Sequence, residues 1–399
     1  MTLTQLQEKY KKAQALNLKL DMSRGKPGAA QLDLSNGLLD EKWLQPAIDE
    51  NGIDCRNYGI LDGIPEIKRL FSELMCMPED QIIVCGNASL AIMYDYLLQC
   101  MLLWSKQGQI KFLCPVPGYD RHFAILEQLG IEMINIPMLD DGPDMAMIAK
   151  HVKDPLVKGV ICVPKYSNPE GKTFSEACVR AFAALKPAAK DFRVIWDNAY
   201  IVHDLHEETD ALLNIHQAAK EHGTEDHFVE VTSFSKVTFP GAAVAAIAAS
   251  PANIKAIKTR MNVQTIGYDK LNQLRHARYF NDLNGIKMHM KKHAEILRPK
   301  FEAVIDILAR DLTGLATWTV PRGGYFISLD LPEGCAKRCA QLLNEAGVVL
   351  TPAGATFPYG KDPLDRNLRI APTFPATEEL AAATELLTLC ARLAILERK

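Results

Sequence analysis

One lysine in this chain follows two serines at alternate positions, in the run 232–241 (TSFSKVTFPG). The residues before it, 231–234, have the composition of a strand end, so alternation along that strand would place Ser233 and Ser235 on one face. Lys236 then lies on the loop that leaves the strand. Because burial disfavours the charged ammonium, a lysine held partly out of water has a lowered pKa, and its neutral amine can form a Schiff base. The serine hydroxyls and nearby backbone N–H groups could hold a phosphate, although a lone Ser-x-Ser-Lys also suits a solvated loop lysine.

A second stretch, 193–200 (RVIWDNAY), is a short apolar run that ends in an acid, with a tyrosine three residues further on. An acid that closes an apolar run needs a partner, because an unpaired buried carboxylate is costly. Together the two stretches resemble the pyridoxal-phosphate aminotransferases of fold type I. The resemblance implies that Asp197 pairs with the pyridine nitrogen, and that Lys236 holds the cofactor as a Schiff base and then serves as general base.

An Asn-Pro-x-Gly motif begins at Asn168, just after the buried-type strand 157–164 and about thirty residues before Asp197. Asn-Pro alone marks only a turn. In this position and order, however, it is similar to a motif of the same family. The resemblance implies that the Asn168 side chain bonds the ring hydroxyl oxygen of the cofactor, with Tyr200 donating to that oxygen from beside it.

The segment 110–122 is predicted to be a strand that runs into a Pro-Gly loop. In the resembled family an aromatic residue after such a loop stacks on the pyridine ring, and Tyr119 has that position here. His122 matches a histidine that some members use to support the pyridine-binding acid. A lone histidine is more often simply packed in the core, so both interpretations of His122 stay open.

Residues 81–90 combine a strand, a glycine turn and the start of a helix. A helix N-terminus offers unpaired N–H groups and the positive end of the helix dipole, both of which suit a phosphate. Asn and Ser also cap helices, so the motif is weak without its place in the order. We expect the phosphate to contact Asn87, Ala88 and Ser89.

Tyr58 lies in a Tyr-x-x-x-x-Gly stretch, and the resemblance implies that its hydroxyl reaches the cofactor phosphate of a partner subunit. The chain departs from many relatives after Pro240-Gly241, where Ala242 replaces a phosphate-binding arginine. The phosphate is therefore expected to depend on other groups. These are Ser233, Ser235, Asn87 to Ser89, and Tyr58 and Thr265 of a neighbouring subunit.

Arg369 lies in the predicted strand 367–372, and the resemblance implies that it binds the substrate α-carboxylate together with Asn168. A guanidinium suits this task because its planar fork matches a carboxylate. Gly25, in the Gly/Pro loop 21–28, matches a glycine that approaches the same carboxylate. An acidic substrate side chain needs a second cation, and the sequence leaves three candidates open: Arg24, Lys26 and Lys270.

The composition is that of an ordinary globular protein, with 399 residues, 48% hydrophobic residues and a net charge of −3. This charge favours neither nucleic acid nor an anionic membrane as partner. No secretory signal is visible, and no apolar run is long enough to span a bilayer. The ten cysteines lack a Cys-x-x-Cys pair, which predicts reduced thiols in a cytoplasmic protein, without a disulfide frame or a metal site.

The resemblance extends from about Asp21 to Ala376 and implies an α/β fold with a large domain built on a mostly parallel, seven-stranded sheet. We expect this domain to comprise residues 46–290. A smaller α+β domain would combine residues 1–45 and 291–399, with a long helix at about 292–310 leading into it. Because Tyr58 would act across an interface, a homodimer is expected.

The missing arginine and the loop Ser23 to Gly28 resemble the aspartate aminotransferase type Ic subgroup, which is close to the effector domain of MocR-type regulators. The expected reaction moves an amino group from an L-amino acid, most naturally aspartate or glutamate, to a 2-oxo acid such as 2-oxoglutarate or oxaloacetate. The alternatives are a transaminase of other amino acids, or a β-lyase on the same fold. A MocR-type regulator would need a winged-helix domain, for which the segment before Asp21 is too short.

Overall fold

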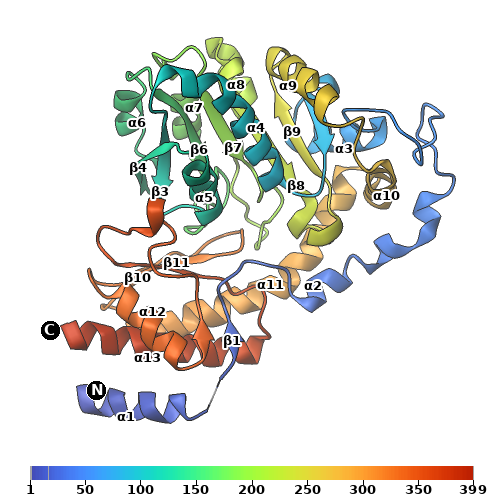
Figure 1. The fold of residues 1–399 in the computed structure, drawn as a ribbon. Coiled ribbons are helices and arrows are strands. Elements are labelled where there is room, and N and C mark those ends of the chain that lie inside the picture. The colour runs from blue at the N-terminus through green and yellow to red at the C-terminus, as the bar shows by residue number, and fades with distance from the viewer. Residues whose placement is uncertain (1, 17, 399) are drawn as a thin grey trace.

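A computed structural model of the chain describes residues 2–16 and 18–398. Two bodies are joined by one long helix, α11 (Leu283–Leu312), which runs from the upper body into the lower one (Figure 1). The remaining helices are α1 (Leu3–Gln14), α2 (Ala29–Asp33), α3 (Pro65–Met75), α4 (Ser89–Trp104), α5 (Asp120–Gln128), α6 (Met145–His151), α7 (Glu176–Ala183), α8 (Ile215–His222), α9 (Pro251–Gln264), α10 (Lys270–Phe280), α12 (Ala336–Glu345) and α13 (Thr377–Arg398).

The upper body is built on a mixed sheet whose strand order is β2-β9-β8-β7-β6-β3-β4-β5. The pairs from β8 through β7, β6 and β3 to β4 are parallel, whereas β9 is antiparallel to both β2 and β8. The strands are β2 (Ile82–Cys85), β3 (Lys111–Val116), β4 (Glu132–Leu139), β5 (Gly142–Pro143), β6 (Val157–Cys162), β7 (Arg193–Asp197), β8 (Phe228–Ser233) and β9 (Ala245–Ala249).

The predicted α/β class is confirmed, but the sheet has eight strands among the described residues where seven were expected. The additional strand, β5, has two residues and pairs antiparallel with the end of β4. A strand of two residues is too short to show hydrophobic alternation, so the sequence pattern does not predict it.

Buried residues of each strand alternate between the two faces of the sheet. Phe112 and Cys114 of β3 join the core under α4, α5 and α9, while Leu113 between them joins the core under α6, α7 and α8. Likewise, Ile195 of β7 faces the first core, and its neighbour Trp196 faces the second. Helices therefore cover both faces, and the loops at the strand ends remain the place where polar groups can gather.

The lower body has its own core, formed by α1, α12, α13, much of α11 and two small sheets. One sheet has the antiparallel order β10-β11-β13, and the other pairs β1 with β12 in parallel. The strands are β1 (Leu20–Asp21), β10 (Thr317–Trp318), β11 (Ile327–Asp330), β12 (Val348–Val349) and β13 (Asn367–Ile370). The N-terminal segment thus packs with the C-terminal part of the chain.

Two predicted element boundaries are corrected by the structure. Strand β8 ends at Ser233, and Phe234–Lys236 forms a 3₁₀ turn, because the Ser233 hydroxyl accepts from the backbone N–H of Ser235 and turns the chain. The long helix was expected from about residue 292, but it begins at Leu283, where Asp282 caps it by accepting from the N–H of Gly285.

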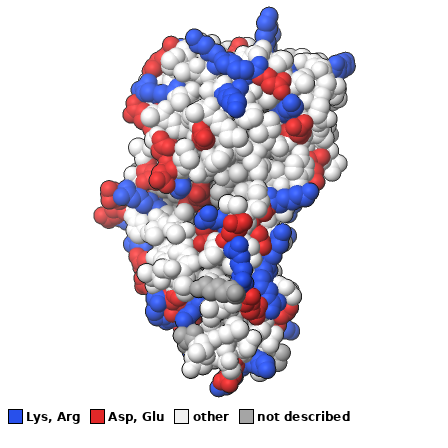
Figure 2. All heavy atoms as spheres, turned by 90° about the vertical axis from the view of Figure 1, so that its left-hand side faces the viewer, with Lys and Arg blue, Asp and Glu red and all other residues white. Residues whose placement is uncertain are grey.

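On the face drawn in Figure 2, lysine and arginine side chains are interspersed with aspartate and glutamate. This mixed distribution fits the small net charge of the chain. No helix within residues 2–16 and 18–398 has the length and apolar character needed to cross a membrane.

Candidate active site

A cavity of about 440 Å³ lies between the two bodies, and Lys236 is one of the residues that line it. The lining comes from both bodies: the loop before α2, the start of α5, the loops after β6, β7 and β8, and the strands β11 to β13 of the lower body. The lining residues are Ser23, Arg24, Gly25, Lys26, Tyr119, Asp120, Arg121, Asn168, Tyr200, Lys236, Phe326, Val349, Leu350, Thr351, Pro352 and Arg369.

Lys236 is partly buried at the end of the 3₁₀ turn that follows β8. Its Nζ lies 5.0 Å from the centroid of the Tyr200 ring and 5.8 Å from that of Tyr325. Burial lowers the pKa of Lys236; the Asp197 carboxylate opposes this shift, and the Arg369 guanidinium adds to it. The amine therefore loses its proton more readily than a solvated lysine.

Asp197 is the last residue of β7, and the residue is 2% exposed. Its Oδ2 lies 2.9 Å from Nε2 of His122, so the supporting role expected for His122 has a matching contact. The other oxygen, Oδ1, is buried and has no hydrogen-bond partner among the described residues. A buried carboxylate oxygen without a partner is costly, so this site suits a donor from a bound molecule.

Two aromatic residues flank this group. Tyr119 precedes α5, and its ring packs edge-on against His122 with a centroid distance of 4.9 Å. Tyr200 is buried in the turn after β7. Burial raises the pKa of Tyr119 to about 12 and that of Tyr200 well above its ordinary value, so both hydroxyls remain protonated donors.

The candidate phosphate contacts come together although they lie far apart in sequence. The Ser235 hydroxyl donates to the Asn87 carbonyl at 2.9 Å, and the Ser233 hydroxyl donates to Ser235 Oγ at 3.0 Å. The predicted proximity of the two serines holds, although the turn, and not strand alternation, produces it. Helix α4 begins at Ser89, and its N-cap residue Ala88 has no side chain that could satisfy the first N–H groups.

Arg369 is buried on β13 and makes four hydrogen bonds. Its Nη1 donates to Asn168 Oδ1 at 3.1 Å and to Asp120 Oδ1 at 2.6 Å, while Nε and Nη2 donate to Thr351 Oγ1 at 3.2 and 3.0 Å. Phe326 lies beneath the guanidinium, with 4.8 Å between Arg369 Cζ and the ring centroid. The arginine is thus held in one orientation within the cavity.

Gly25 is required by its surroundings, because a Cβ at this position would lie 2.4 Å from Cζ of Phe326. Of the three candidate cations, Arg24 and Lys26 line the cavity. Lys270 does not, because its buried Nζ donates to the Gly59 carbonyl at 3.0 Å on another face of the molecule. The structure therefore does not place Lys270 at the cavity of its own chain.

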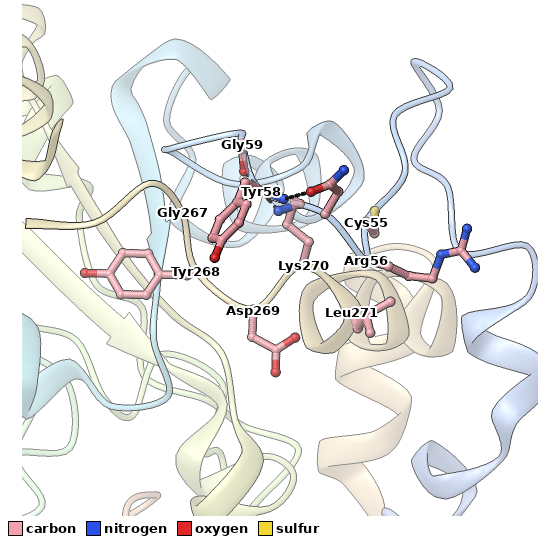
Figure 3. A pocket seen from close by; sticks show the side chains of 10 residues that line it. Cys55, Arg56, Tyr58, Gly59, Gly267, Tyr268, Asp269, Lys270 and Leu271 are labelled. Carbon is pink, nitrogen blue, oxygen red and sulfur yellow. Dashed lines mark hydrogen bonds between the residues drawn. The ribbon is translucent and has the colours of Figure 1, made fainter.

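Tyr58 is 81% exposed and lies on that other face, beside a separate cavity of about 480 Å³ (Figure 3). Figure 3 shows its side chain with those of Tyr268, Asp269 and Lys270 around this cavity. The structure therefore does not bring Tyr58 to Lys236 of its own chain. Thr265 is the C-cap residue that follows α9, three residues before Tyr268, and its hydroxyl donates to the carbonyl of Gly267.

Sequence reasoning missed Asp120, Arg121, Thr351 and Phe326. The first two follow Tyr119 directly, and a charged pair beside a predicted ring-stacking residue could have identified them. Thr351 and Phe326 carry no such signal, because a threonine in a loop and a phenylalanine beside a strand are most often packing residues.

Comparisons with known proteins identify aminotransferases as the relatives of this chain. The family described as aspartate amino-transferase matches residues 1–399. An aspartate aminotransferase from Corynebacterium glutamicum is 43% identical over 402 residues, which cover 98% of this chain and 93% of that protein. A putative aminotransferase from Mycolicibacterium smegmatis is 45% identical, covering 98% of this chain and 94% of that protein. The crystal structure of an aspartate transaminase from C. glutamicum superposes with a TM-score of 0.96 at 42% identity, covering 99% of this chain and 96% of that one.

Proposed function

Since this chain belongs to the aspartate amino-transferase family and is an aminotransferase, we propose that its substrates are L-aspartate or L-glutamate and the matching 2-oxo acids. Its cofactor would be pyridoxal 5'-phosphate, and the reaction would proceed as two half-reactions that share one site. The observation that carries this proposal is the combination of Lys236, with its lowered pKa, and Arg369 in one cavity, close to the unpartnered oxygen of Asp197.

The residues present fit the cofactor. Asp197 Oδ1 is buried without a partner, and a protonated pyridine nitrogen would supply the donor that it lacks. The ring of Tyr119 offers a surface for stacking on the pyridine. The uncapped start of α4 offers backbone N–H donors to a phosphate, in place of the arginine that is missing after Gly241. The Ser235 hydroxyl, which donates to the Asn87 carbonyl in the free protein, could turn to donate to the phosphate once it is bound.

When bound, pyridoxal phosphate supplies an electron-withdrawing ring that stabilises negative charge at the substrate α-carbon. Asp197, supported by His122, would keep the ring nitrogen protonated by placing a carboxylate beside it. The neutral amine of Lys236 would take the proton from the substrate α-carbon, and its lowered pKa favours the neutral form that this step needs. Tyr200 and Asn168 would donate to the ring oxygen, and Arg369 would hold the α-carboxylate with Asn168 and Gly25 beside it.

The preference for an acidic side chain is supported by the charge of the cavity. Besides Arg369 and Lys236, three cationic side chains line it, Arg24, Lys26 and Arg121, against one acidic side chain, Asp120. A dicarboxylate would be held at one end by Arg369 and at the other by a cation of this group. Replacing each of the three by Gln in turn would identify the cation, since only its loss should raise KM for aspartate far more than KM for a neutral amino acid.

We also propose a homodimer. Tyr94, Leu98 and Leu102 recur every four residues along α4 and are exposed, and Val263 at the end of α9 is 91% exposed. An exposed apolar stripe of this kind suits an interface between subunits. Tyr58, exposed on the face in Figure 3, would then reach the phosphate bound by the other subunit.

The core of the lower body is distinct from the cores on the two faces of the large sheet, and this supports the proposed domains, a large one of residues 46–290 and a small one of residues 1–45 and 291–399. Met1, Asn17 and Lys399 lie outside the described residues. A cytoplasmic location is proposed from the ten cysteines, all of which are free thiols and most of which are buried.

The test is a visible absorption spectrum of the purified protein with pyridoxal phosphate. A yellow band that disappears with L-aspartate and returns with 2-oxoglutarate would support both half-reactions, and Lys236→Ala should abolish the band. A β-lyase would instead release product continuously without any 2-oxo acid. A protein that stays colourless after incubation with the cofactor would refute the proposal.

A further inference from the structure

Asp120 points a carboxylate at the arginine that is proposed to bind substrate. Its Oδ1 lies 2.6 Å from Nη1 of Arg369, and its side chain is 30% exposed, whereas that of Arg369 is 5% exposed. The two residues come from different bodies, since Asp120 begins α5 of the upper body and Arg369 lies on β13 of the lower one. The pair therefore crosses the cavity in which the substrate must lie.

The hydrogen bonds of Arg369 leave little room for another ligand. A guanidinium has five N–H groups. Among the described residues, four are donated: one to Asp120, one to Asn168 and two to Thr351. A carboxylate that binds side by side to Nη1 and Nη2 needs two of them, so one present acceptor must leave.

Asp120 is the acceptor most easily released. Thr351 is fixed by its own donation to the Ser23 carbonyl at 2.6 Å, and Asn168 is buried. Asp120 is the only anion among the three acceptors, so it is also the one that repels an incoming carboxylate. Once released, its charge would remain at the N-terminus of α5, where the helix dipole favours an anion.

We propose that Asp120 is an internal competitor for Arg369: it holds the guanidinium in the free enzyme, and the α-carboxylate of a substrate binds by displacing it. The exchange keeps one carboxylate on Arg369 before and after binding, so the cavity never holds an unpaired buried cation. The inference rests on the proposed function, since it concerns a carboxylate substrate at Arg369.

The competition acts on binding and not on proton transfer at Lys236. The competition should therefore lower the affinity for every ligand that places a carboxylate on Arg369, whether amino acid or 2-oxo acid. It should raise KM while leaving kcat nearly unchanged. A residue that served only to orient Arg369 would have the opposite effect on affinity when removed.

The experiment measures binding of maleate, a dicarboxylate without an amino group, to the protein loaded with pyridoxal phosphate, by titration calorimetry. Asp120→Asn should bind maleate about tenfold more tightly than the unaltered protein, because the competing charge is gone. KM for aspartate and for 2-oxoglutarate should fall by a similar factor, with kcat changed by less than about twofold. Asp80→Asn is the matched control. It removes an exposed charge just before β2, at the end of that strand away from Asn87, and it should leave maleate affinity and both KM values unchanged.

An Asn at position 120 could fold poorly or could still accept from the guanidinium. Asp120→Ser, whose shorter side chain takes the acceptor out of the reach of Arg369, should likewise bind maleate more tightly. Equal or weaker maleate binding by both variants would overturn the inference while leaving the proposed function intact. Failure of the unaltered protein to bind maleate at all would overturn both.

Discussion

Replacing Asp197 by Asn tests whether the buried carboxylate is present for a bound cofactor. Asn has nearly the same shape, and its oxygen can still accept from His122, whose Nε2 lies 2.9 Å from the present carboxylate. The change removes the negative charge and puts an amide NH2 group where Oδ1 would accept from a protonated ring nitrogen. The free protein should not lose stability, because an unsatisfied buried carboxylate oxygen is itself destabilising.

The magnitude follows from the bond that is lost. A hydrogen bond to a charged group contributes about 1.5–3 kcal/mol, so pyridoxal phosphate should bind roughly 10- to 150-fold more weakly. An unfolding entropy of about 2 cal/mol/K per residue over a chain of this length means that each kcal/mol of lost stabilisation lowers the melting temperature by roughly 1 °C. The rise in melting temperature that the cofactor causes should therefore be smaller by about 2 °C in the variant.

The assay is calorimetric melting with and without cofactor, together with a dissociation constant from a spectroscopic titration. Asp140→Asn, which alters a fully exposed carboxylate, is the matched control and should behave like the unaltered protein. If Asp197→Asn keeps the cofactor affinity within twofold, or if the free variant is less stable by more than about 1 kcal/mol, the carboxylate is structural and the reasoning fails.

Three further outcomes are expected. Burial lowers the pKa of His276 to about 4 and that of His293 to about 3. Because the unfolded chain takes up these protons near pH 6.5 and the folded protein only at lower pH, the free energy of unfolding should be unaffected by the two groups above pH 6.5. It should fall as the pH decreases toward the folded pKa values, by about 1.4 kcal/mol per pH unit for each histidine. Urea unfolding between pH 4 and 8 measures this decline, and His293→Gln should make it shallower. Gly25→Ala would force Cβ against Phe326, which lies beneath Arg369, the residue proposed to bind substrate. Stability should fall by about 1–3 kcal/mol and KM should rise more than kcat falls, whereas an unchanged KM would contradict the proposed contact. Leu98→Glu should convert the proposed dimer into a monomer in sedimentation analysis, and an unaltered protein that is already monomeric would refute the proposed interface.

Much of the site could be predicted because its parts lie in short runs with a local signature. A strand that ends in a polar residue, such as Asp197 after Ile195 and Trp196, marks the edge of a sheet where chemistry can occur. The order of the motifs along the chain identified the family, and Lys236, Asn168 and Arg369 do line one cavity. The mistakes concerned local geometry that periodicity does not contain, such as the turn that follows Ser233 and the two-residue strand β5.

The sequence by itself therefore determined which residue types are available for chemistry and in which kind of element each one lies, because these depend on neighbours along the chain. The tertiary structure alone decided which of them meet. Asp120 and Arg369 are 249 residues apart and pair only because α5 and β13 face one another across the cavity. Lys270 does not line this cavity in its own chain for the same physical reason: its side chain donates to the Gly59 carbonyl beside a separate cavity. A contact between two bodies depends on how they pack together, and no local pattern of residues encodes it.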